Sequence, residues 1–133
     1  MILRSSLVAV VAVVSLAGVA LAQSSGSAPS PIGVWRGTSL CLVKPSACHD
    51  EVVVYRMTST KSDSVSLDAR KIVNGREEEM GVLPCRIGAG RATVTCTMPN
   101  GVWRFTVRGD SLVGELRLPD STKFRDVRAA RSR

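Results

Sequence analysis

Short β-rich runs, broken by turn residues about every ten positions, fill the chain from residue 32 to its end. No window in this region has a helical period long enough to predict a helix. Because every connection is short and none can hold a crossover, neighbouring strands should pair antiparallel. We therefore predict eight strands, at residues 32–42, 51–58, 64–73, 76–85, 91–98, 101–108, 111–118 and 122–131.

Eight meandering strands leave two exposed edges, and closure into a barrel removes both. The predicted fold is therefore all-β, a single small antiparallel eight-stranded meander barrel over residues 32–133. A two-sheet β-sandwich is the alternative.

The dipeptide Asn74-Gly75 gives the clearest local prediction, since both residues tolerate the positive φ of a two-residue type I′ turn. This turn sets Lys71 opposite Glu78, and strand alternation then assigns one face of the hairpin to the interior. The residues expected on that face are Val65, Leu67, Ala69, Met80 and Val82, with Lys71 and Glu78 at its turn end.

Four cysteines constrain the chain further, because an even number in a small exported domain predicts two disulfides. Proximity in sequence and the turns between them favour Cys41–Cys48 and Cys85–Cys96 over the other two connectivities. Each bridge should add about 2–3 kcal/mol to stability. The rival reading, a metal site, is disfavoured because no C-x-x-C pair is present, and no cofactor is expected.

Residues 1–22 have the pattern of a signal peptide: one positive charge at Arg4, an apolar run, and small residues at Ala20 and Ala22. An uncleaved anchor is the alternative, but about 20 apolar residues are needed to cross a bilayer. We expect cleavage after Ala22, a flexible linker at 23–31, and a secreted or periplasmic mature protein without a membrane span.

The mature chain of 111 residues has 13 arginines, four lysines and a net charge of +6. Such a balance attracts anionic partners, for example an acidic protein or an anionic cell-surface polymer. Nucleic acid is a less favoured partner, because few aromatic residues are spare for base stacking.

The motif Gly33-Val34-Trp35 at the start of the first strand resembles the G-x-W motif of lipocalins and their relatives. The resemblance implies that Trp35 closes one end of the barrel and that an arginine of the last strand, Arg128 or Arg131, packs across its indole. The chain also looks like the small secreted lipocalin-like proteins of bacteria that have no assigned function.

Catalytic machinery is not visible in the sequence. His49 is the single histidine, and it sits beside Cys48, which is expected to be bridged. No G-x-S-x-G, H-E-x-x-H or glycine-rich phosphate loop is present. The run of Glu77, Glu78 and Glu79 does not indicate catalysis, because each of these residues either faces a basic residue across the hairpin or lies beside its turn. We therefore expect a protein that is not an enzyme.

An eight-stranded barrel is wide enough either to fill with side chains or to hold one small ligand. Gly37, Ala69 and Gly114 on inward faces should leave room for a modest cavity. The first hypothesis is a binding module for a small apolar or amphipathic ligand. Its expected ligand-binding residues are Trp35, Leu67, Lys71, Glu78, Met80, Trp103 and Phe105.

The second hypothesis is a filled barrel that acts as an inhibitor or adaptor. It would use either the 41–50 loop or a surface patch that recognises an acidic protein or anionic polymer. The arginines predicted to form that patch are Arg104, Arg117, Arg125 and Arg128. The two hypotheses differ in the interior volume that they require: a ligand-binding module needs a cavity, whereas a filled barrel has none.

Overall fold

The structure is a computed structural model, and it describes residues 28–133. The predicted signal peptide and residues 23–27 lie outside this range. The eight strands are β1 (Gly33–Cys41), β2 (Glu51–Lys61), β3 (Ser64–Val73), β4 (Arg76–Ile87), β5 (Thr93–Met98), β6 (Gly101–Arg108), β7 (Ser111–Arg117) and β8 (Lys123–Arg131).

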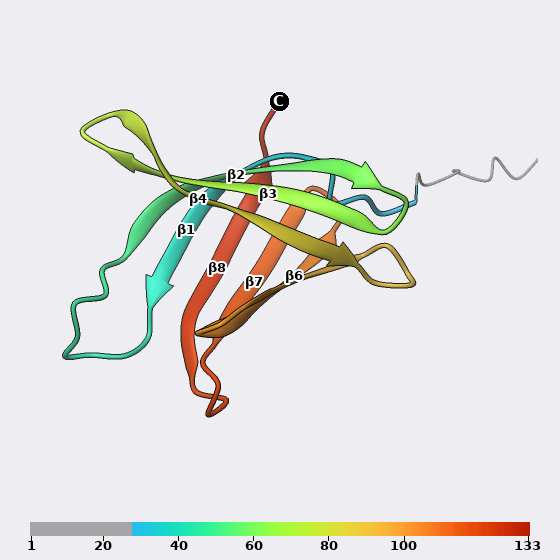
Figure 1. The fold of residues 1–133 in the computed structure, drawn as a ribbon. Helices are drawn as coiled ribbons and strands as arrows, with labels where there is room; N and C mark the ends of the chain where they lie inside the picture. The colour runs from blue at the N-terminus through green and yellow to red at the C-terminus, as the bar shows by residue number, and fades with distance from the viewer. Residues whose placement is uncertain (1–27) are drawn as a thin grey trace, which may run out of the picture.

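Each strand pairs antiparallel with the next, and β8 pairs with β1, so the sheet closes into one barrel (Figure 1). The predicted eight-stranded meander barrel is confirmed, and the sandwich alternative is wrong. The strand bounds differ by a few residues. β2 continues to Lys61 and β4 to Ile87, because antiparallel pairing extends past the residues where the sequence pattern ends.

The hairpin between β3 and β4 has the predicted register around its turn. Val73 faces Arg76 and Lys71 faces Glu78, and the two turn residues have positive φ angles of 50° and 76°. The hairpin tip projects beyond the strands around it (Figure 1). The sequence therefore fixes this local geometry.

A β-bulge interrupts the same hairpin further from its turn, so that Ala69 faces Gly81 instead of Met80. A bulge adds one residue to one strand, which reverses the facing of every residue beyond it. The inward facing predicted for Val82 is therefore wrong, and this side chain is 54% exposed. Met80 is the extra residue of the bulge and is 41% exposed.

Both predicted disulfides, Cys41–Cys48 and Cys85–Cys96, are present. They indicate an oxidising environment, extracellular or periplasmic. No helix in the described part of the chain is long and apolar enough to span a membrane.

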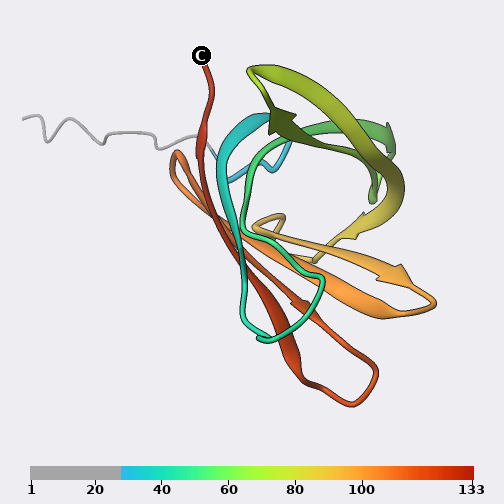
Figure 2. The same cartoon turned by 90° about the vertical axis from the view of Figure 1, so that its left-hand side faces the viewer.

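The Cys85–Cys96 bridge lies at the weakest seam of the barrel. β4 and β5 share two residue pairs, which follow directly beyond the bridge at the end of β4. On the other side of the bridge the two strands separate toward the β3–β4 and β5–β6 turns (Figures 1 and 2). The disulfide thus joins the strands where their hydrogen-bonded ladder ends.

The interior is filled by alternate residues of the strands, for example those of β2 and β6. Tyr55, Met57, Phe105 and Val107 are all at most 5% exposed. Together they form part of one continuous apolar core.

Two glycines do not leave the room that we expected. A Cβ atom at Gly37 would collide with the carbonyl oxygen of Arg128 on β8, so this glycine allows β1 and β8 to approach each other. A Cβ atom at Gly114 would lie 2.5 Å from the ring of Phe105, so that space is already filled. Gly37 and Gly114 are therefore positions of close packing.

Trp35 closes the end of the barrel at which β1 begins. Its side chain is fully buried, and its Nε1 donates a hydrogen bond of 2.8 Å to the carbonyl oxygen of Pro31. The guanidinium of Arg131 lies over the indole ring. Of the two arginines implied by the lipocalin resemblance, Arg131 packs on the tryptophan, whereas the side chain of Arg128 is 74% exposed on the outer face.

Candidate ligand-binding cavity

A cavity of about 270 Å³ occupies the opposite half of the barrel from Trp35, near the start of β2 and β8. Pockets for drug-sized ligands usually measure about 300–1,000 Å³, so this one suits a smaller molecule. The lining residues are Ser39, Glu51, Tyr55, Leu67, Ala69, Met80, Gly81, Leu83, Met98, Trp103, Phe105, Leu116 and Arg125.

The wall of the cavity is mostly apolar and partly aromatic. The rings of Trp103 and Phe105 stack with centroids 5.6 Å apart and an interplanar angle of 6°. Tyr55 meets Phe105 edge-on at 5.5 Å. Strand alternation brings Trp103 and Phe105 to one face of β6, and the neighbouring strand β7 contributes Leu116. This wall offers an apolar ligand flat surfaces for contact.

One end of the cavity is polar. The Nη1 of Arg125 lies 3.0 Å from the carbonyl oxygen of His49 and 3.2 Å from the hydroxyl of Ser39, to both of which it donates. The carboxylate of Glu51 is 3.6 Å away from the same nitrogen. The Arg125 and Glu51 side chains are 14% and 21% exposed, so the pair is largely shielded from water.

Tyr55 is buried beside this polar end, with 2% of its surface exposed. Burial raises the pKa of its phenol well above 10.0, the value of the free group. The nearby Ser39 side chain and the positive charge of Arg125 oppose this rise in pKa but do not cancel it. The phenol therefore remains neutral at physiological pH and can serve as a hydrogen-bonding group beside the cavity.

The structure places four of the seven predicted ligand-binding residues around this cavity: Leu67, Met80, Trp103 and Phe105. Trp35 lies instead in the closed end of the barrel. Lys71 and Glu78 face each other in the register of the projecting hairpin but do not line the cavity. Whether any of these residues binds a ligand stays a prediction.

The polar end was missed in the sequence, although alternation offered a signal for it. Arg125 shares its strand face with the buried Val127, and Ser39 shares its face with the buried Trp35. The placement of Arg125 in a surface patch is therefore wrong, since its side chain points into the barrel. Glu51 likewise lies on the same strand face as the buried Val53 and Tyr55.

The other arginines predicted for the surface patch do lie outside the barrel. Arg104 and Arg128 line a groove on the outer face. Arg117 also lies outside, where its Nε donates a hydrogen bond of 2.7 Å to Glu115 and its Nη1 donates one to the Ser121 carbonyl oxygen. Its charge is therefore already engaged.

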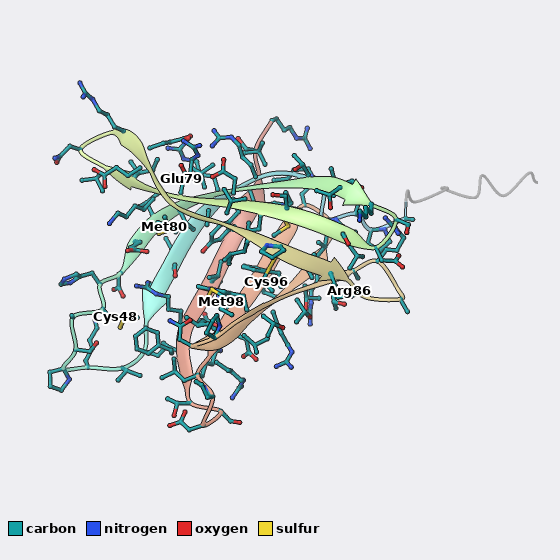
Figure 3. All side chains as sticks on the ribbon, in the orientation of Figure 1. Cys48, Glu79, Met80, Arg86, Cys96 and Met98 are labelled. Atoms are coloured by element: carbon teal, nitrogen blue, oxygen red, sulfur yellow. A yellow bond between two sulfur atoms is a disulfide. The ribbon has the colours of Figure 1, made fainter. Side chains whose placement is uncertain are left out.

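Strands β4 and β5, which separate on one side of the Cys85–Cys96 bridge, both contribute to the lining of the cavity. Met80 on β4 and Met98 on β5 lie on opposite sides of this gap, and both line the cavity (Figure 3). Methionine side chains are flexible and adapt to different shapes.

No group of three or more metal-ligating side chains occurs within residues 28–133. The fold and the cavity define a small, disulfide-bonded, eight-stranded antiparallel barrel with an apolar pocket and one polar end. The chain matches no protein-family model, and no curated protein or solved structure matches it.

Proposed function

We propose that this protein is a non-enzymatic, lipocalin-like binding module that holds one small, mainly apolar ligand inside its barrel. The observation that carries the proposal is the 270 Å³ cavity, apolar along its wall and polar at one end. Binding sites for small molecules commonly combine an apolar wall with a few placed polar groups. The signal-peptide pattern and the disulfides support action outside the cytoplasm, secreted or periplasmic.

The polar end favours a ligand whose head group is uncharged. Glu51 already lies beside Arg125, so the pair is close to neutral before a ligand arrives. A carboxylate or an ammonium group would bring an uncompensated charge into a shielded site, which costs free energy. A hydroxyl or carbonyl group can hydrogen-bond to Arg125, Ser39 or Glu51 without that cost.

The test compares three probes of equal chain length, 1-octanol, octanoate and octylamine, by isothermal titration calorimetry. We expect 1-octanol to bind at least about tenfold more tightly than either charged probe, a difference of about 1.4 kcal/mol. The variant Glu51→Gln leaves the charge of Arg125 uncompensated, so it should shift the preference toward octanoate. A variant that prefers 1-octanol as strongly as the original protein would contradict the proposed role of the pair.

A plug variant tests the cavity itself. Ala69→Phe places a ring in the cavity and should abolish binding of 1-octanol, whereas Ala130→Phe adds the same ring on the exposed face of β8 and should leave binding intact. Unchanged binding by Ala69→Phe would refute the cavity as the site. Native mass spectrometry of the protein purified from its own host is a separate measurement, which would identify a ligand that co-purifies with it.

A further inference from the structure

A second hollow, of about 430 Å³, lies on the outer surface of the barrel. We call it the outer groove. It is formed by β6, β7 and β8, which lie side by side in Figure 1. Its lining residues are Arg104, Thr106, Arg108, Val113, Gly114, Glu115, Lys123, Asp126 and Arg128. None of them lines the interior cavity, so the two sites are separate.

The outer groove has four cationic side chains and two carboxylates, and the carboxylates are already engaged. Glu115 accepts hydrogen bonds from Arg117, and this interaction lowers the pKa of its carboxyl group. Asp126 accepts a hydrogen bond of 2.8 Å from Lys123. Its second oxygen lies 3.5 Å from Arg128, which is 74% exposed, and such exposed pairs contribute little.

Arg104 and Arg108 are less constrained. Neither makes an ion pair with any residue in the 28–133 range, although Arg104 is the register partner of Glu115. Both are exposed. Together with Arg128, they leave three guanidinium groups on this surface that can turn toward an anionic partner.

Strand geometry fixes how these three arginines are spaced. Arg104 and Arg108 are four residues apart on one face of β6, hence about 13 Å apart along the strand. Arg128 lies two strands away, in the row of paired residues that contains Thr106 and Val113. This row crosses β6 midway between Arg104 and Arg108. Arg128 lies about 10 Å from β6 across the sheet. The three backbone positions form a triangle with sides of roughly 12 Å.

The floor of the outer groove indicates the class of partner. Thr106 offers a hydroxyl group and Val113 a small apolar surface, both suited to a sugar ring. No aromatic side chain lines the groove, so the stacking that single-stranded nucleic acids need is not provided. None of the large exposed apolar residues lines it either, so the groove lacks the apolar anchors common in protein interfaces.

We propose that the outer groove binds an acidic polysaccharide through Arg104, Arg108 and Arg128. Guanidinium groups form paired hydrogen bonds with sulfate and carboxylate groups, and three of them on one surface can hold several charged groups of one polymer chain. The site would retain the protein at an anionic matrix or envelope while the interior cavity stays free for its own ligand.

The test measures binding of the disulfide-bonded protein to two immobilised probes, heparin for sulfate and polygalacturonate for carboxylate groups. The variant Arg104→Gln/Arg108→Gln/Arg128→Gln should weaken binding about 30-fold, at about threefold for each exposed charge contact. The matched control Lys61→Gln/Arg76→Gln/Arg86→Gln removes the same charge from exposed positions elsewhere and should change affinity less than about threefold.

A third variant, with all three groove arginines replaced by lysine, keeps the charge but loses the paired hydrogen bonds. It should bind more weakly than the original protein and more tightly than the glutamine variant. The proposal is overturned if the original protein binds neither polymer, or if the control variant loses as much affinity as the groove variant. Equal, groove-dependent binding of duplex DNA would overturn the assignment to a polysaccharide.

Discussion

The guanidinium carbon of Arg131, near the end of the last strand, lies 4.2 Å from the ring centroid of Trp35 in the first strand. The same guanidinium donates hydrogen bonds of 2.9 Å to the carbonyl oxygens of Ile32 and Ser30. One side chain thus joins the N-terminal segment, the first strand and the last strand. Arg131 therefore stabilises the end of the barrel that Trp35 closes.

Replacing this arginine should therefore be costly. Arg131→Ala should lower the free energy of unfolding by about 3 kcal/mol, because two charge-assisted hydrogen bonds and the cation–π contact are lost together. Arg131→Lys should lose about half as much, since lysine cannot reproduce the planar fork. Urea denaturation measures both. Arg133→Ala removes an 87% exposed arginine nearby and should change stability by less than about 0.5 kcal/mol.

The close approach of β1 and β8 at Gly37 gives a second prediction. Gly37→Ala should lower the free energy of unfolding by about 3 kcal/mol, because the added methyl group meets the backbone of β8, which cannot yield like a side chain. Gly90→Ala is the matched control, since nothing lies within 4 Å of its added Cβ atom. Equal stability of the two variants in thermal unfolding would show that β1 and β8 are less tightly packed than described.

The two disulfides should differ in what they stabilise. They are separated by 7 and 11 residues in sequence, so chain entropy assigns about 2–3 kcal/mol to each. Cys85–Cys96 also holds the seam where β4 and β5 share two residue pairs. Cys85→Ala/Cys96→Ala should therefore cost at least about 1 kcal/mol more than Cys41→Ala/Cys48→Ala. It should also speed hydrogen exchange in β5, and unchanged exchange there would contradict this role.

Tyr55 is the single tyrosine, so its ionisation can be followed by the ultraviolet absorbance of the phenolate. Burial holds the pKa of the folded-state phenol above the free value of 10.0. As the pH rises past 10.0, the unfolded chain loses this proton while the folded protein keeps it. The free energy of unfolding should therefore fall with rising pH in this range. A folded protein that ionises at the free value would show that Tyr55 is open to water.

The fold could be predicted from sequence because its signals are local. Two-residue periodicity, the Asn74-Gly75 turn and the spacing of the cysteines each depend on residues close together in the chain. The shared facing of Trp103 and Phe105, two residues apart on β6, is also a consequence of alternation. This reasoning failed at the bulge near Met80, because a bulge depends on how β3 and β4 accommodate the curvature of the closed barrel.

The candidate site was predictable only along its apolar wall. Leu67, Trp103 and Phe105 could be placed by alternation within their own strands. The polar end joins Arg125 to Ser39, which is 86 residues away. Alternation within each strand indicates that both side chains face inward, but not that they meet. The pairing of β8 with β1 decides that Arg131 packs on Trp35, because it sets these two residues opposite each other.

The sequence by itself determined that this chain forms eight short antiparallel strands, tied by two disulfides between near neighbours, with alternate side chains inside. The tertiary structure alone decided where the barrel leaves a cavity and which polar side chains meet at its end. The physical reason is that alternation and turn chemistry act over a few residues, whereas register shifts and the closure of β8 onto β1 depend on the whole sheet.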